Sequence, residues 1–289
     1  MDWVTLKIPS YYNQFQLIDF LIDMQVSRKK IVSLENDQLL KVNGIFVPFS
    51  SCLKTDDELD IALTQDQTLD YEPDTTEANI LYEDDFVIVV DKPSNTIIYS
   101  DDFTNQHTLA NQVACYYQHH NLNLKIRHLH RLDKDTTGAI MYAKNILSHA
   151  YYSVLWNSET ITRKYIALVE GHFDKPCGII NLPIGKDRHK NNHFLVLQSG
   201  KQAVTHYQVI KELEKTSLIE LTLETGRTHQ IRVHMNYLKH PLLGDKEYGS
   251  KMLCPRVMLH SSSITFFHPL KRDYITVLSP LPGDMNRFI

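Results

Sequence analysis

Strand-like runs dominate this chain from about residue 86 onward, and helices do not alternate with them in a regular way. Apolar residues recur at helical spacing at two places among the runs, over 109–117 and over 228–238. Strands that do not alternate strictly with helices indicate an α+β domain with a mixed, largely antiparallel sheet rather than a doubly wound one. The six strand-like runs lie at 86–90, 162–169, 204–210, 218–223, 264–267 and 274–278.

The first 78 residues differ from the rest of the chain in charge. They contain 6 Lys and Arg against 14 Asp and Glu and no His, whereas the remainder contains 24 against 20 and all 15 His. The net charge of −4 at pH 7 is therefore the sum of a negative N-terminal part and a positive C-terminal part. The positive part is the one expected to bind phosphates. Residues 71–79 are polar, acidic and interrupted by Pro, which predicts a linker. We expect a small domain over 1–70 and a large one over 80–289.

The acidic part has its own pattern of short elements. Residues 16–21 suggest a short helix, and Ser27 is a candidate N-cap for a second helix that begins at Arg28. Asn43-Gly44 lies in the middle of the strand-like stretch 40–47, which predicts a tight turn between two strands. These elements predict a small α+β domain.

Several classes of protein are disfavoured by what the chain lacks. No segment approaches the 18 or more uninterrupted apolar residues that a membrane span needs, so no membrane partner is expected. The N-terminus lacks the layout of a secretion signal, so the cytoplasm is the expected compartment. The four cysteines form no Cys-x-x-Cys pair, which argues against both a disulfide framework and a zinc knuckle. They are Cys52, Cys115, Cys177 and Cys254.

One short polar segment has the composition of a catalytic loop. It reads His130-Arg131-Leu132-Asp133-Lys134-Asp135-Thr136-Thr137-Gly138, so that Asp133 lies between two basic residues just ahead of a turn. Flanking cations favour an ionised, nucleophilic carboxylate, and a sharp turn can direct it into a cleft. An isolated Asp before Thr-Thr-Gly can equally be a turn cap, so the assignment depends on the rest of the chain.

The loop resembles the HRLD-x-x-T-[ST]-G motif of the RluA-type pseudouridine synthases, which isomerise uridine within RNA. Where the first motif of that family continues Lys-Pro-x-Gly, this chain has Ser94-Asn95 after Lys-Pro, and Asn can adopt the left-handed backbone conformation of Gly. The resemblance implies the catalytic fold of that family from about Ile80 onward. The segments that agree are 81–93, which ends in Lys-Pro, 163–171, which contains Tyr165, 223–234, and 240–245.

The resemblance also implies which residues carry the chemistry. Asp133 matches the nucleophile or charge stabiliser beside ribose carbon 1′, and Tyr165 matches the Tyr that packs on the target base near carbon 5. Burial disfavours an ionised carboxylate unless a cation opposes it, and Arg232 occupies the family position whose basic residue pairs with the catalytic Asp. Arg227 is the competing choice. If 228–238 is one helix that starts beside Arg227, the two arginines point about 140° apart, so both cannot meet one carboxylate.

The same resemblance implies contacts with RNA and no cofactor. Arg131 matches an Arg that fills the space vacated by a flipped nucleotide, and a guanidinium can stack on bases while it binds phosphate. His130 and His229 are further candidates for contact with the substrate, and Arg227 and Lys92 for contact with RNA. The basic segment that contains Lys186, Arg188 and Lys190 is a less specific candidate for the RNA backbone.

The N-terminal part resembles the small alpha-L RNA-binding module that often precedes this catalytic domain. Its contact residues would be Arg28, Lys29 and Lys30, although a three-residue basic run is also common on a solvated helix face. Such a module favours ribosomal RNA over transfer RNA as the substrate of a monomeric enzyme.

Two other functions compete with this interpretation. His128-x-His130, with the later His229 and His234, is how many zinc hydrolases begin, but no further ligand set appears at a characteristic spacing. A non-enzymatic RNA chaperone or ribosome-assembly factor would keep the basic surface without needing Asp133 and its partners together.

Overall fold

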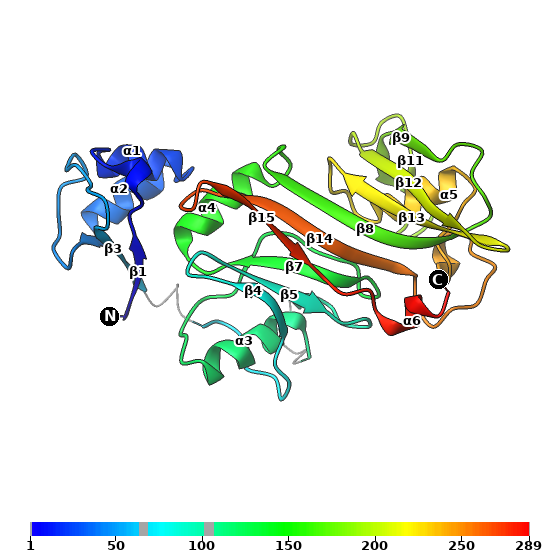
Figure 1. Ribbon diagram of the computed structural model, residues 1–289, viewed down its shortest axis with the longest axis horizontal. Helices are drawn as coiled ribbons and strands as arrows, with labels where there is room; N and C mark the ends of the chain where they lie inside the picture. Colours follow the sequence, from blue (N-terminus) through cyan, green and yellow to red (C-terminus); the bar gives the residue numbers. More distant parts are fainter. Residues whose placement is uncertain (1, 64–68, 101–106, 289) are drawn as a thin grey trace.

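The computed structural model describes residues 2–63, 69–100 and 107–288. It contains a three-stranded N-terminal sheet, a ten-stranded main sheet and a two-stranded hairpin. Figure 1 shows the N-terminal unit at one end of the molecule, beside the long strands of the main sheet. No helix among the described residues is long and apolar enough to cross a membrane.

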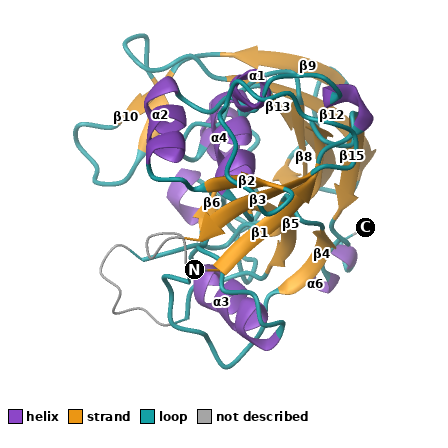
Figure 2. Cartoon of the chain, turned by 90° about the vertical axis from the view of Figure 1, so that its left-hand side faces the viewer, coloured by secondary structure: helices purple, strands orange, loops and turns teal. Residues whose placement is uncertain are grey.

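The N-terminal unit packs two helices on an antiparallel sheet ordered β1-β3-β2, as the end-on view of Figure 2 shows. Ser27 caps α2 as expected, because its side chain accepts from Lys30 N at 3.4 Å. The turn at Asn43-Gly44 forms with both residues at positive φ, but only one bridge follows it, so the expected second strand is absent. The elements are β1 (Asp2–Lys7), η1 (Ser10–Tyr12), α1 (Leu17–Asp23), α2 (Arg28–Asn36), β2 (Leu40–Val42) and β3 (Glu58–Leu63).

The polar segment expected to be a linker lies along a helix of the catalytic part. Asn111 Nδ2 donates to Glu72 O at 2.7 Å, and Asp74 N donates to Asn111 O at 3.0 Å. Residues 64–68, just before the expected domain boundary, lie outside the described residues. The boundary between the two domains therefore stays a prediction.

The main sheet is antiparallel except for one pair of strands, which confirms the predicted α+β class. Its order is β4-β5-β7-β14-β8-β13-β12-β9, with β15 paired to β14 and β6 paired to β7. The parallel pair is β7 and β14. Its strands are β4 (Asn79–Glu83), β5 (Val87–Lys92), β6 (Arg127–His128), β7 (Thr137–Ala143), β8 (Ile161–Glu170), β9 (Cys177–Asn181), β12 (Val204–Glu212), β13 (Thr216–Leu223), β14 (Leu259–His268) and β15 (Asp273–Leu278).

Helices cover both faces of the main sheet, so the central strands are buried on both sides. In β5, Val87 and Val89 join the core that contains Leu147, whereas Ile88 and Val90 join the core that contains Val113. This alternation follows from the two-residue period of a strand. The remaining elements are α3 (Leu109–His119), α4 (Ile146–Leu155), β10 (Ile184–Lys186), β11 (Phe194–Val196), α5 (Gln230–Tyr237), η3 (Lys246–Tyr248) and α6 (Gly283–Asn286).

Candidate active site

The loop that carries Asp133 runs from β6 into β7 and ends at a glycine that cannot be replaced without strain. Gly138 has a φ of 108°, and a Cβ at this position would lie 2.2 Å from Ser261 O on the parallel strand β14. The close approach of β7 to β14 therefore requires Gly at the end of the motif. Pairing of Gly138 with Ser261 places the loop at one end of these two strands.

Lys92 anchors this loop through hydrogen bonds to backbone carbonyls, and its side chain is buried. Its side chain is 1% exposed, and its Nζ donates to Lys134 O and Thr136 O at 2.8 Å and to Pro93 O at 2.9 Å. Burial lowers the pKa of Lys92 to about 7, and the charges of Asp135 and Asp133 oppose that shift. The prediction that Lys92 contacts RNA is wrong, because the core encloses its ammonium group.

His130 anchors the other end of the loop. Its Nε2 accepts from Met141 N at 3.0 Å, and its ring stacks on Trp156 with the centroids 4.3 Å apart. Burial holds the pKa of His130 well below its usual value, which agrees with a neutral acceptor. The ring forms part of the wall of a cavity, but its acceptor nitrogen already has a partner.

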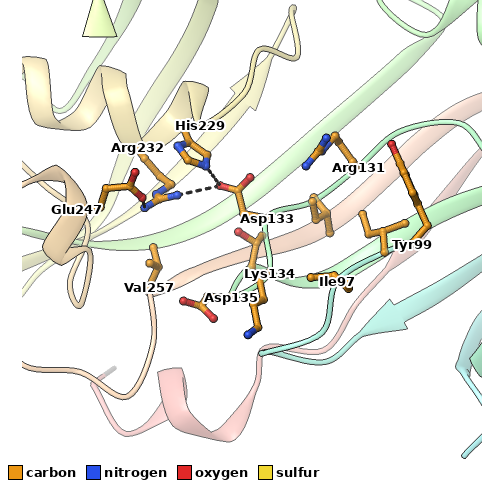
Figure 3. A pocket seen from close by; sticks show the side chains of 13 residues that line it. Ile97, Tyr99, Arg131, Asp133, Lys134, Asp135, His229, Arg232, Glu247 and Val257 are labelled. Carbon is orange, nitrogen blue, oxygen red and sulfur yellow. Dashed lines mark hydrogen bonds and ion pairs between the residues drawn. The ribbon is translucent and has the colours of Figure 1, made fainter. Parts of the chain in front are cut away.

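Asp133 projects into a cavity of about 430 Å³ between the loop and α5. Figure 3 shows Arg232 and His229 on one side of its carboxylate and Arg131 on the other. Arg232 Nη1 lies 3.4 Å from Asp133 Oδ2, so the structure brings together the pair that the motif implies. The Asp133 side chain is 27% exposed, which leaves it accessible from the cavity.

Arg232 is held in place by acidic residues just before and in η3. Its Nε and Nη2 donate to the two oxygens of Asp245 at 2.7 and 2.8 Å, and Nη2 also donates to Glu247 Oε2 at 2.8 Å. Burial opposes the charged guanidinium, but hydrogen bonds to Asp245 and the nearby carboxylates outweigh burial and raise the pKa of Arg232. A bidentate pair with a buried carboxylate fixes the direction of the guanidinium.

Arg227 lies outside the helix that carries Arg232. The helix α5 begins at Gln230, and His229 before it has a left-handed φ of 56°. The angle expected from a continuous helix therefore does not apply. Arg227 lies in the turn before the helix, and its Nε donates to Gln202 O at 2.9 Å.

His229 lies beside the Asp133 carboxylate but is too far from it for a hydrogen bond. Its Nδ1 lies 2.9 Å from the Tyr248 hydroxyl, which already accepts from Phe194 N at 3.1 Å. We therefore assign the hydroxyl hydrogen to Nδ1, which leaves the ring hydrogen on Nε2, 3.8 Å from Asp133 Oδ2. Burial lowers the pKa of His229 despite the opposing charge of Asp133, which favours this neutral form.

Tyr165 shares a small cavity of about 70 Å³ with Asp133. It lies on β8 and is 6% exposed. Burial raises the pKa of Tyr165, and the charge of Asp133 adds to this effect, so the phenol is protonated at neutral pH. The three residues that the motifs nominate for chemistry, Asp133, Tyr165 and Arg232, thus line one connected region.

Comparison with known proteins identifies the family. The model of a family described as RNA pseudouridylate synthase matches residues 86–237. This chain belongs to the RluA-type RNA pseudouridine synthases. The uncharacterized RNA pseudouridine synthase YhcT of Bacillus subtilis is 38% identical in an alignment of 267 positions that covers 91% of this chain and 88% of that protein.

Further relatives of this synthase agree. Ribosomal large subunit pseudouridine synthase D of Haemophilus ducreyi is 33% identical in an alignment of 280 positions that covers 91% of this chain and 86% of that protein. The solved structure of human RNA pseudouridylate synthase domain containing 1 has a TM-score of 0.60 at 26% identity, over 72% of this chain and 86% of that one.

Several residues of this synthase site were missed or given no role in the sequence interpretation. Asp245 lies in a matched segment, but nothing in the sequence links it to Arg232. Glu247 and Tyr248 follow it in η3, and the Tyr248 ring lies 4.7 Å from the Arg232 guanidinium carbon. The signal that could have found them is the short spacing of two acidic residues and a Tyr after a matched segment.

The basic residues and histidines named from the sequence occupy different surroundings. Lys186, Arg188 and Lys190 are exposed on or beside the hairpin of β10 and β11. His234 is buried, with Nδ1 near Thr205 Oγ1 at 2.9 Å and Nε2 near Leu182 O at 3.0 Å. Within the part of the chain that the structure describes, no three His, Cys, Asp or Glu gather as a metal site would require.

Proposed function

We propose that this enzyme isomerises specific uridines to pseudouridine in structured RNA, and that the RNA is ribosomal rather than transfer RNA. The observation that carries the proposal is a partly exposed carboxylate, Asp133, held by a buried and fully paired arginine inside a cavity. Two relatives support the choice of RNA, since both are named ribosomal large subunit pseudouridine synthase D and match over most of this chain.

The reaction breaks the bond between ribose carbon 1′ and uracil nitrogen 1 and joins carbon 1′ to carbon 5 of the same ring. Asp133 acts at the sugar, where its negative charge meets the positive charge that develops as the base departs. Arg232 and His229 both face Oδ2 of Asp133, which leaves Oδ1 for the substrate. Carbon 5 then loses its proton and nitrogen 1, which kept the electron pair of the broken bond, gains one. We assign the relay of the proton from carbon 5 to the Tyr165 phenol, which can accept one proton as it gives up its own in a dry site.

A uridine within folded RNA must first leave its stack, which costs a few kcal/mol. Arg131 is exposed at the mouth of the cavity and can take the place of the flipped nucleotide. Arg28, Lys29 and Lys30 of α2 are proposed to add contacts from the N-terminal unit. We further propose that the enzyme acts as a monomer in the cytoplasm.

The test is chemical mapping of pseudouridine in total RNA from cells with and without this protein, followed by reaction of the purified enzyme with the mapped RNA. Asp133→Asn should abolish isomerisation while RNA affinity and the melting temperature stay close to those of the wild type. The substitution keeps the size of the side chain, removes its charge and replaces one acceptor oxygen by an amide nitrogen. Turnover by clean Asp133→Asn protein would refute the role of Asp133.

A loss of sites confined to transfer RNA would refute the ribosomal assignment alone. Unchanged pseudouridine maps together with RNA binding by the purified protein would instead favour a non-catalytic assembly factor.

A further inference from the structure

One buried arginine near the site has no acidic partner. Arg163 on β8 is 3% exposed, its Nε is buried with no hydrogen-bond partner, and no ion pair joins its guanidinium to a carboxylate among the described residues. The guanidinium carbon lies 5.5 Å from the centroid of the Trp156 ring. Buried charges in proteins are normally paired, because an unpaired one loses its hydration without compensation. Arg163 therefore lacks a partner that a ligand could supply.

Arg163 lines a cavity whose other charged groups are also mostly arginines. The cavity has a volume of about 260 Å³ and is lined by Arg131, Arg163 and Arg227. Asp133 is the one carboxylate among its lining residues. Arg131 is exposed, and the Nε of Arg227 donates to a backbone carbonyl. Neither arginine forms an ion pair with a described residue. The three arginines outnumber the one carboxylate, so the charged side chains that line the cavity have a net positive charge.

The backbone beside this cavity leaves room for the buried guanidinium. A Cβ at Gly226 would lie 3.0 Å from Arg163 Nη1, which is closer than most side chains tolerate. Gly226 is exposed and directly precedes Arg227. Arg163 therefore extends from the buried strand to the edge of the cavity, where it comes close to the turn that carries Arg227.

We propose that Arg163, Arg131 and Arg227 form a binding site for one phosphodiester of the RNA, next to the uridine that meets Asp133. The proposal rests on the proposed function, because it assigns the anion to the RNA substrate. Guanidinium groups bind phosphate through paired N–H donors, and they do so most strongly where water is excluded. Asp133 and Tyr165 line the same cavity, so the phosphate belongs to the reacting nucleotide or to its immediate neighbour.

The first test compares Arg163→Met with Lys164→Met in full-length protein without RNA. Lys164 is the next residue along β8, and it is paired with Glu220 at 2.8 Å. If Arg163 awaits a ligand, removal of its unpaired charge leaves the melting temperature unchanged or raises it. A marked fall for Arg163→Met, but not for Lys164→Met, would show that Arg163 is a structural residue and would overturn the proposal.

The second test uses inorganic phosphate as the probe. Phosphate titrated at constant ionic strength should raise the melting temperature of the wild type and of Lys164→Met, and the rise should be absent in Arg163→Met and partly restored in Arg163→Lys. Chloride at the same ionic strength should have no such effect. An equal phosphate response in Arg163→Met and in the wild type would contradict the assignment.

The third test separates the RNA backbone from free phosphate as the natural ligand. The affinity for the mapped substrate RNA is measured against salt concentration, and each lost contact with single-stranded RNA lowers the slope of log K by about 0.7. Arg163→Met should lower the slope by that amount. RNA with one uncharged methylphosphonate beside the target uridine should bind the wild type about tenfold more weakly but bind Arg163→Met with no further loss.

If Arg163→Met keeps the RNA affinity and the salt slope of the wild type, the site takes free phosphate alone. That result would overturn the RNA assignment. Neither the melting nor the phosphate measurement requires turnover. If the wild type forms no pseudouridine but Arg163→Met loses the phosphate response, the proposed function fails while the anion site stands.

Discussion

Replacement of Lys92 by Met tests whether the catalytic loop is held by a buried ammonium group. The substitution keeps most of the apolar length of the side chain and removes donors to Pro93 O, Lys134 O and Thr136 O. A hydrogen bond from a charged donor contributes about 1.5–3 kcal/mol, and a carbonyl left unsatisfied costs about 1–3 kcal/mol. Relief of the buried charge offsets part of this sum. We expect the free energy of unfolding to fall by about 2–4 kcal/mol.

The activity of this variant should fall as well, because two of the three carbonyls belong to the loop that carries Asp133. Urea unfolding at pH 6, below the Lys92 pKa of about 7, measures stability while the ammonium is charged. Single-turnover isomerisation and RNA affinity are measured at the same pH. We expect a lower rate of isomerisation with little change in RNA affinity, since Lys92 is enclosed by protein.

Lys134→Met is the matched control, because Lys134 is an exposed member of the same loop and carries the same charge. Its loss should leave stability unchanged and weaken RNA binding. If Lys92→Met bound RNA more weakly but unfolded at the same free energy as the wild type, the anchoring role would be refuted. That result would favour the contact between Lys92 and RNA that the sequence suggested.

Three further predictions follow from the site and from the charge distribution. Arg232→Met leaves Asp245, whose side chain is 1% exposed, without its partner, so the free energy of unfolding should fall by about 3–5 kcal/mol. The rate of isomerisation should fall by orders of magnitude, whereas Arg227→Met should chiefly weaken RNA binding. Burial lowers the pKa of His128 to about 4 from an unfolded value near 6.5, so the unfolded chain binds a proton that the folded chain does not. Stability should therefore fall as the pH drops through this window, by up to about 1.4 kcal/mol per pH unit for this group, and His128→Phe but not the exposed His189→Phe should flatten the slope measured by urea unfolding. Combined replacement of Lys186, Arg188 and Lys190 by Ser should weaken RNA binding more than the same replacement of Arg28, Lys29 and Lys30, and the reverse order in a filter-binding assay would contradict the charge argument.

The pairing of Asp133 with Arg232 could be predicted from the sequence because both residues lie in motifs with fixed positions. The helix argument against Arg227 reached the right partner for a wrong reason. It assumed a helix that starts beside Arg227, whereas the left-handed backbone at His229 starts the helix two residues later than expected. A residue with positive φ ahead of a helix is not visible in hydrophobic periodicity, which reports only the regular part of an element.

The strands were easier to predict than the turns. The run 162–169 became β8 (Ile161–Glu170), and 264–267 lies in the C-terminal half of the longer β14 (Leu259–His268). The expected strand after Asn43-Gly44 did not form, because β2 pairs with β3 instead and the turn is closed by a single bridge. Local signals specify a turn, but the partner of each strand depends on residues far away in the sequence.

The roles of the buried cations could not be predicted from sequence, because Lys and Arg are ordinarily exposed and a motif does not show which of them is enclosed. Lys92, Arg232 and Arg163 are all at most 8% exposed, yet their surroundings differ. Lys92 is satisfied by three carbonyls and Arg232 by carboxylates, so each has a structural reason for being buried. Arg163 has no such partner among the described residues, and it lines a cavity with two other arginines. A buried cation with its partners present holds the site together, whereas one without them is poised to receive an anion, and this difference separates the predicted effects of Lys92→Met and Arg163→Met on stability.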